Sequence, residues 1–68
     1  SKLQEVVQTF SKNAPTYIVM RTEGPDHAKI FWVSVVVDNT EKETGQGNSK
    51  QEAEQKAAAK TLEKMGKL

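Results

Sequence analysis

The chain contains no cysteine, and its 68 residues include two prolines, one histidine and one tryptophan. Without cysteine, neither a disulfide framework nor a thiolate zinc site can stabilise the fold. A single histidine also excludes a metal site built from several histidines, and a cysteine–histidine catalytic pair. No apolar run approaches the roughly 20 residues that cross a bilayer, and no secretory signal pattern opens the chain. We therefore expect an intracellular, cytoplasmic protein that has no membrane contact.

An excess of charge of either sign is absent as well, because the formal net charge is +1. Bulk electrostatics therefore do not indicate a nucleic-acid-binding protein, and any such function has to follow from where the lysines lie. The length predicts one small domain over residues 1–68, of a size that buries only about 60% of its unfolded surface. Because the sequence starts inside a helical pattern, we expect this domain to be a fragment of a longer protein.

The apolar pattern predicts five elements. Leu3, Val6, Val7 and Phe10 follow the i, i+3, i+4, i+7 spacing of a helix that extends from Ser1 to about Ser11. Three β-rich segments are expected as strands, at residues 16–22, 29–37 and about 41–46. A second helix is expected from about Ser49 to Gly66, and its alanine-rich arc favours close packing on a sheet.

These elements predict an α+β domain with the order α-β-β-β-α. Hairpin connections make the three-stranded sheet antiparallel. In the second strand, one face carries Phe31 and the alternating valines, and the other carries Ile30, Trp32, Ser34 and Val36. Each predicted helix has a single apolar stripe, so we expect both helices to pack on the same face of the sheet.

Four fragments in this order resemble a double-stranded-RNA-binding domain. They are "LQEVVQ" in the first helix, "APTYIV" in the first strand, "EGPDHAKIFWVSVVV" and "GQGNSKQEAEQKAA". The combination is most similar to the C-terminal domain of bacterial ribonuclease III. The resemblance implies a module that binds double-stranded RNA by its A-form shape. It implies no cofactor in this domain, whereas a parent ribonuclease III would cleave RNA with magnesium in a separate catalytic domain.

A ligand of this kind requires contacts to two successive minor grooves and to the phosphates between them, over about 16 base pairs. The resemblance assigns the first minor-groove contact to Gln4 and Gln8, with Glu5 at its margin. Glutamine both donates and accepts hydrogen bonds, which suits 2′-hydroxyls and base edges. Taken without the resemblance, these three residues are more typical of a solvated helix face.

The resemblance assigns the second minor groove to the turn that contains Pro25, Asp26 and His27. Proline stiffens such a turn, the imidazole extends from it, and the carboxylate only accepts hydrogen bonds from hydroxyls. A lone histidine in a turn is otherwise an ordinary turn residue. The chemistry of this segment therefore depends on its context in the fold.

The phosphate contact is expected at the start of the second helix, where free N–H groups and the positive end of the helix dipole favour an anion. Ser49 is the predicted N-cap, Lys50 adds a charge, and Gln51 and Lys56 complete the group. Gly45 and Gly47 are expected to let the chain turn sharply before the helix.

Two departures from the family pattern leave an alternative open. Gln51 and Glu54 occupy positions where the family more often has lysines, which lowers the expected affinity for phosphate. The alternative is a protein–protein interaction or dimerisation module that binds RNA weakly through the same fold, with an open sheet face around Trp32 as its partner surface. Stacking of unpaired bases on Trp32 is a further interpretation. Independent catalysis is not expected, because "GQGNSK" lacks the spacing of a nucleotide-binding loop.

Overall fold

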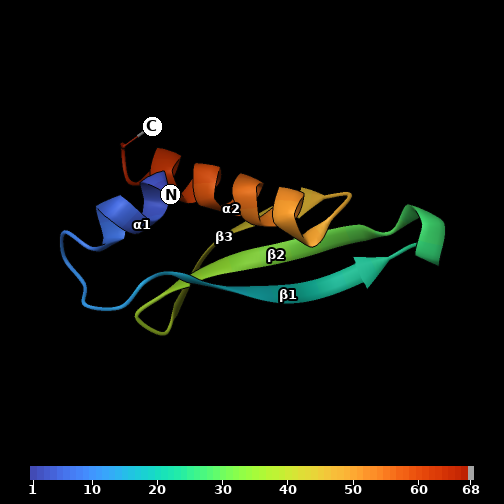
Figure 1. The fold of residues 1–68 in the computed structure, drawn as a ribbon, viewed down its shortest axis with the longest axis horizontal. Coiled ribbons are helices and arrows are strands. Elements are labelled where there is room, and N and C mark those ends of the chain that lie inside the picture. The colour runs from blue at the N-terminus through green and yellow to red at the C-terminus, as the bar shows by residue number, and fades with distance from the viewer. Residues whose placement is uncertain (68) are drawn as a thin grey trace.

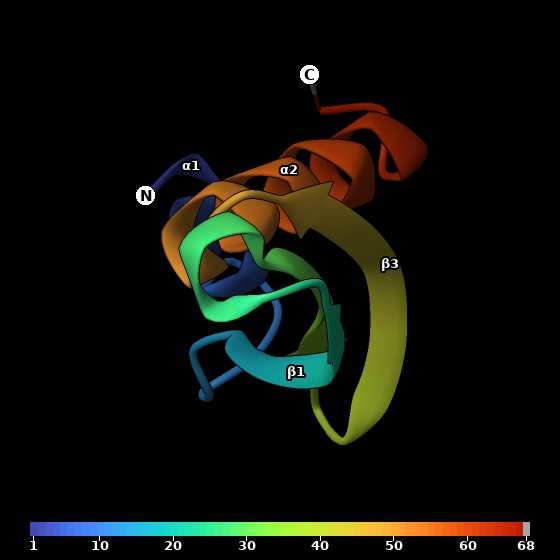
Figure 2. The same ribbon diagram turned by 90° about the vertical axis from the view of Figure 1, so that its right-hand side faces the viewer.

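The computed structural model describes residues 1–67 and has the predicted order of elements (Figure 1). The elements are α1 (Lys2–Val7), β1 (Thr16–Glu23), the short 3-10 helix η1 (Asp26–Ala28), β2 (Ile30–Val37), β3 (Thr40–Gly47) and α2 (Lys50–Lys64). The strands form one antiparallel sheet in the order β1-β2-β3. Both helices lie on the same side of this twisted sheet, as Figure 2 shows, so the predicted α+β architecture is confirmed.

Two different connections join the strands. Asp38 and Asn39 form the β2–β3 turn with φ angles of 49° and 64°, and two consecutive positive φ angles define the hairpin turn whose twist matches paired strands. The β1–β2 connection is longer and runs through η1. Within β1, the pairing partner shifts between Val19 and Arg21, which places a bulge at Met20.

The core lies between the two helices and the middle of the sheet. Its buried members come from α1, β2 and α2, and they are Leu3, Val7, Val35, Val37, Ala57 and Leu62. Tyr17, Ala58 and Met65 pack against this cluster from its margin. The predicted apolar stripes of both helices are therefore the faces that the molecule buries. No helix in residues 1–67 is both long and apolar enough to cross a membrane.

The prediction for the first helix was wrong at its C-terminal end, since α1 stops at Val7 and Phe10 is 58% exposed. After Val7, the N–H groups of Thr9 and Phe10 bond carbonyls only three residues back, at 3.1 Å each. The hydroxyl of Ser11 then donates to Asp38 in the β2–β3 turn at 2.7 Å. These contacts tighten the chain and draw it away from the helix axis, so Phe10 leaves the apolar stripe.

The prediction that Gly45 and Gly47 provide a sharp turn was also wrong. Both lie within β3, and neither has a positive φ. Their role is close packing, because an added Cβ at Gly45 would lie 2.8 Å from the Lys56 carbonyl carbon and nearer still to two other backbone atoms of α2. At Gly47 it would lie 2.7 Å from the Ala53 nitrogen. The glycines bring β3 against the backbone of α2 and so fix the position of that helix on the sheet.

Candidate nucleic-acid interface

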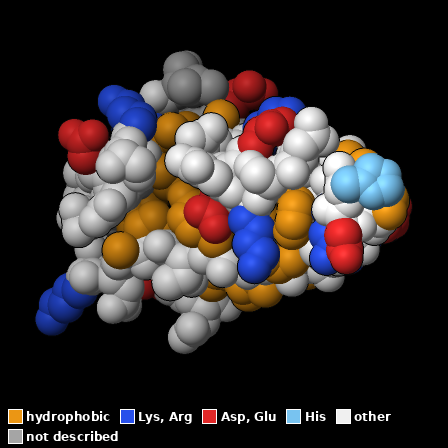
Figure 3. All heavy atoms as spheres, turned by 45° about the vertical axis from the view of Figure 1, so that its right-hand side comes forward, with side chains coloured by type: hydrophobic (Ala, Val, Ile, Leu, Met, Phe, Trp, Pro, Cys, Tyr) orange, Lys and Arg blue, Asp and Glu red, His pale blue; other side chains and the backbone are white. Residues whose placement is uncertain are grey.

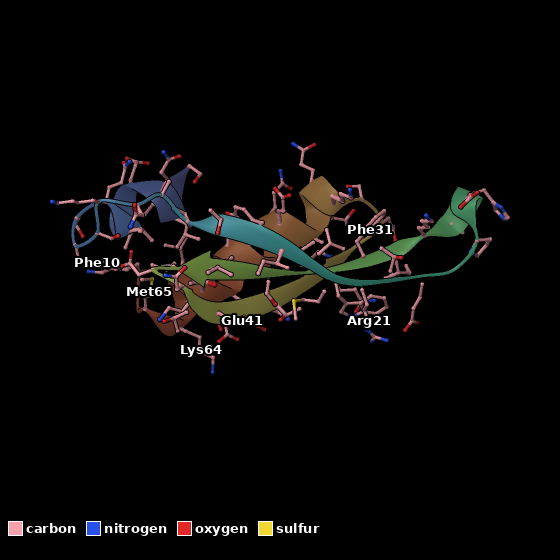
Figure 4. All side chains as sticks on the ribbon, turned by 90° about the horizontal axis from the view of Figure 1, so that it is seen from below. Phe10, Arg21, Phe31, Glu41, Lys64 and Met65 are labelled. Carbon is pink, nitrogen blue, oxygen red and sulfur yellow. The ribbon has the colours of Figure 1, made fainter. Side chains whose placement is uncertain are left out.

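The predicted site residues come from three places along the length of the molecule. In Figure 1, α1 lies at one end, the β1–β2 connection lies at the other, and the beginning of α2 lies between them. Seen from below in Figure 4, all three lie along the same long side of the molecule. The longest dimension of the molecule is 40 Å. The fold therefore spreads the three groups along one elongated surface without gathering them into a pocket.

On α1, the side chains of Gln4, Glu5 and Gln8 are exposed. Ser1 is the N-cap, and its hydroxyl accepts the Gln4 N–H at 3.2 Å. Gln8 is the C-cap and donates its backbone N–H to the Gln4 carbonyl at 3.0 Å. Because the backbone groups satisfy one another, the polar ends of the three side chains are available to a ligand.

The β1–β2 connection is a short, defined turn. Gly24 has a φ of 94°, and the Ala28 N–H donates to the Pro25 carbonyl at 2.9 Å. Lys29 lies 3.6 Å from the fully exposed Asp26 carboxylate, as an ion pair across one turn. The imidazole of His27 is exposed, and Figure 3 shows it in pale blue projecting from the end of the molecule.

A shallow hollow connects this turn to the loop before α2. Its lining includes His27, Lys29 and Phe31 on one side and Asn48 on the other. The sequence analysis did not assign Phe31 or Asn48 to the interface. The pairing register of β2 and β3 brings the β1–β2 turn close to the loop before α2, and the alternation of apolar residues within one strand does not reveal that register. The position of Asn48 just before a helix N-cap was the only available signal.

At the start of α2, Ser49 is the N-cap as predicted, and its hydroxyl accepts the Glu52 N–H at 3.1 Å. Lys50 and Gln51 are exposed. Lys56, also assigned to this group, lies 3.3 Å from the Glu52 carboxylate. Lys50 has no ion-pair partner within the described part of the chain, so it is the unneutralised lysine of the group.

Glu54 has a different environment from the other residues of this helix turn. It is half-buried, and one turn before Ala58 it lies on the edge of α2 that faces the core margin. Burial raises the pKa of the Tyr17 hydroxyl above 10.0, and the nearby negative charge of Glu54 raises this pKa further. The negative charge of Glu54 therefore acts on Tyr17 of β1, and Glu54 lies one helical turn after Lys50.

The opposite face of the sheet is partly closed by its own side chains. The Arg21 guanidinium stacks 3.9 Å from the centre of the Trp32 ring and also pairs with Glu23. Ser34 is fully buried and hydrogen-bonds to Thr44 at 2.6 Å. Trp32 is half-buried beneath Arg21. This cover argues against the interpretation of Trp32 as a platform for unpaired bases.

The acidic and histidine side chains do not gather into a metal site in residues 1–67.

The chain is 48% identical over 63 residues to ribonuclease 3 of Syntrophomonas wolfei, and 54% identical over 61 residues to ribonuclease 3 of Mycolicibacterium paratuberculosis. These alignments cover 93% and 90% of this chain but only 27% and 25% of the relatives. The chain thus spans about a quarter of the length of the curated relatives that it matches.

A solved structure described as the first dsRBD of protein HYL1 superposes with a TM-score of 0.76 and 32% identity, and the match covers 98% of this chain and 94% of that one. The family model for the double-stranded RNA binding motif matches residues 1–65, which is nearly the whole sequence. Family model, relatives and fold agree, and they confirm the resemblance seen in the four sequence fragments. The chain belongs to the double-stranded RNA binding motif family.

Proposed function

We propose that this chain binds double-stranded RNA by its A-form shape and serves as the RNA-binding part of a ribonuclease III. The observation that carries the proposal is the placement of three exposed polar groups along one side of a molecule 40 Å long. On A-form RNA, two successive minor grooves and the phosphates between them extend over about 16 base pairs. A surface of this length is sufficient to reach two minor grooves and the phosphates between them.

In this proposal, α1 and the β1–β2 turn occupy the two minor grooves. The exposed amides of Gln4 and Gln8 donate to and accept from 2′-hydroxyls and base edges, and Glu5 accepts from a hydroxyl at the margin. Pro25 and Asp26 define the turn, and His27 extends from it into the second groove. Because 2′-hydroxyls line this groove only in RNA, these contacts favour RNA over DNA.

The beginning of α2 meets the phosphates. Ser49 and the first N–H groups of the helix provide the positive end of its dipole, and Lys50 adds a full charge that no neighbour neutralises in residues 1–67. Gln51 adds a hydrogen-bond donor. Lys56 contributes less than Lys50, since Glu52 compensates its charge.

The proposal is tested by comparing binding of an RNA duplex, a DNA duplex and a single-stranded RNA over a range of salt concentrations. We expect the RNA duplex to bind tightest. Lys50→Ala should weaken that binding roughly three- to tenfold and reduce the slope of log K against log salt by about one phosphate contact. Gln4→Ala and His27→Ala should weaken binding with a smaller effect on the slope, because they remove no fixed charge from the phosphate contact.

Lys64→Ala is the matched control, because it removes the same charge from the same helix on the side of the molecule away from the proposed interface (Figure 4). It should change RNA affinity less than Lys50→Ala does. Equal binding of the three nucleic acids would contradict recognition of A-form shape. Equal effects of the two lysine variants would contradict a phosphate contact at the start of α2.

A protein–protein interaction module with weak RNA binding is a second candidate function. The observation that favours it is on β1, where Ile18, Val19 and Met20 are exposed in succession on an edge strand. The predicted partner surface around Trp32 is less open than this strand, because Arg21 covers the ring. The same binding comparison separates the two functions, since this candidate requires little or no preference for the RNA duplex.

A further inference from the structure

The first two turns of α2 carry a balanced set of charges. From residue 50 to residue 56, Lys50 and Lys56 oppose Glu52 and Glu54, so that the formal charge of the segment is zero. Positive charge at the start of a helix raises its affinity for phosphate, and the start of α2 has no net positive charge from its side chains. The distribution of the four charges therefore decides what a phosphate encounters there.

The four charges do not pair equally. Glu52 precedes Lys56 by four residues, which is the favourable orientation for a helical ion pair, and the two side chains lie 3.3 Å apart. Lys50 and Glu54 have the same spacing in the reverse, less favourable orientation. No ion pair joins them among residues 1–67. Consequently Lys50 and Glu54 remain as two separate, uncompensated charges on one face of the helix.

The position of Glu54 is restricted. The residue is half-buried, whereas Lys50 and Gln51 are exposed. Glu54 also lies one turn before Ala58, which packs against the core, and it is close enough to Tyr17 on β1 to favour the protonated form of the phenol. Residues four apart are neighbours on a helix surface, so the Glu54 carboxylate lies close to a ligand that contacts Lys50.

We propose that Glu54 lowers the affinity of the phosphate contact by placing a negative charge beside Lys50, so that binding depends mainly on the two groove contacts. The inference rests on the proposed function, and it assigns a role to the half-buried carboxylate of this segment that forms no ion pair among residues 1–67. The repulsion acts on phosphate, which RNA and DNA share. It should therefore lower the affinity for the RNA duplex and for the DNA duplex by a similar factor.

The decisive variant is Glu54→Gln, which keeps the size and helix propensity of the side chain and removes its charge. We expect it to tighten binding of an RNA duplex of about 16 base pairs or more, and of the matching DNA duplex, by roughly threefold at low salt. This factor corresponds to one unit charge about 7 Å from a phosphate in water. The salt slope should become steeper by up to about one contact, and Glu54→Lys should extend both effects.

Glu63→Gln is the matched control, since it makes the same change in net charge on an exposed residue at the other end of α2. It should alter affinity by less than Glu54→Gln does. Unchanged or weaker RNA binding by Glu54→Gln would overturn the inference. A change that affects RNA but not DNA would also overturn it, because the carboxylate would then be contacting a 2′-hydroxyl.

The unmodified chain separates this result from a failure of the proposed function. If it shows no preference for the RNA duplex, the proposed function is wrong, and the inference falls with it. If it prefers the RNA duplex and Glu54→Gln does not tighten binding, only the role of Glu54 is wrong. Circular dichroism of each variant establishes that the helices are retained before the affinities are compared.

Discussion

Val19 on β1 and Val33 on β2 are direct partners in the sheet, yet their environments differ. Val33 is fully buried, whereas Val19 is 41% exposed, and its neighbours Ile18 and Met20 are 48% exposed. The two valines have the same side chain and oppose each other across the β1–β2 pair. The difference arises from α2, which packs over β3 and β2, so that much of β1 stays outside its cover (Figures 1 and 2).

The glycines of β3 explain why α2 lies where it does. Gly45 and Gly47 are buried and allow the backbone of β3 to approach α2 more closely than any side chain would permit. This contact draws the helix toward one edge of the sheet and leaves the opposite edge, β1, exposed. Stability is therefore concentrated in β2, β3 and α2, while β1 keeps apolar residues in contact with water.

The strongest way to disrupt this arrangement is Gly45→Ala. The added Cβ would lie 2.8 Å from the Lys56 carbonyl carbon, and the atoms in its way belong to the α2 backbone, which cannot rotate aside. We expect a loss of about 3 kcal/mol in the free energy of unfolding, at the upper end of the cost of overpacking. Urea unfolding followed by circular dichroism measures this loss.

Gly66→Ala is the control for that experiment. Gly66 lies after α2 with a φ of 73°, and an added Cβ there would meet no atom within 4 Å. The cost should be limited to the left-handed backbone of alanine, about 1 kcal/mol. If Gly45→Ala were no more destabilising than this control, the close contact between β3 and α2 would not determine the position of the helix.

A second experiment measures the comparison directly, by truncating each partner of the Val19–Val33 pair to alanine. Val33→Ala should cost about 2 kcal/mol, because it removes two buried methyl groups at about 0.8 kcal/mol each and leaves a small cavity. Val19→Ala should cost about 0.5 kcal/mol. The difference measures the cover that α2 provides together with the central position of β2 and the edge position of β1. Similar losses would show that β1 is protected by something other than α2.

Much of this organisation could be predicted from the sequence, because the signals are local. Alternation in residues 29–37 identified β2, and the spacing of Leu3, Val6 and Val7 identified the buried face of α1. Ser49 was predicted as the N-cap of the second helix, and this cap is present. Within the proposed interface, the resemblance to a family supplied the residues, and the fold placed their elements along one side of the molecule.

The failures involve contacts that a local pattern does not show. Just beyond the end of α1, Ser11 hydrogen-bonds to Asp38, which is 27 residues away in the sequence. The role of Gly45 depends on the backbone of α2, because a glycine before a helix suggests a turn until the neighbouring helix is seen. Local periodicity carries no information about either contact. The same is true of Asn48, which joins the interface only through its position opposite the β1–β2 turn.

Tyr17 belongs to the exposed strand β1 and also packs against the buried core. It provides the smallest of the expected effects. Burial, and to a lesser degree the charge of Glu54, raises the pKa of its hydroxyl above 10.0 in the folded chain. The unfolded chain therefore loses the phenolic proton first as pH rises. The stability that Tyr17 contributes is fully present below pH 10.0 and is lost as pH rises through the folded pKa.

Because the chain has one tyrosine, ultraviolet absorbance of the phenolate reports Tyr17 alone. We expect its titration to lie above that of the urea-unfolded chain, and Glu54→Gln to bring it only part of the way back, since burial is the larger cause. Tyr17→Phe should remove this component of the alkaline loss of stability, and the difference in stability between the two chains isolates the contribution of Tyr17. If the pKa of the Tyr17 phenol in the folded chain were equal to or lower than its pKa in the unfolded chain, Tyr17 would be exposed to water. The start of β1 would then be as uncovered as Val19.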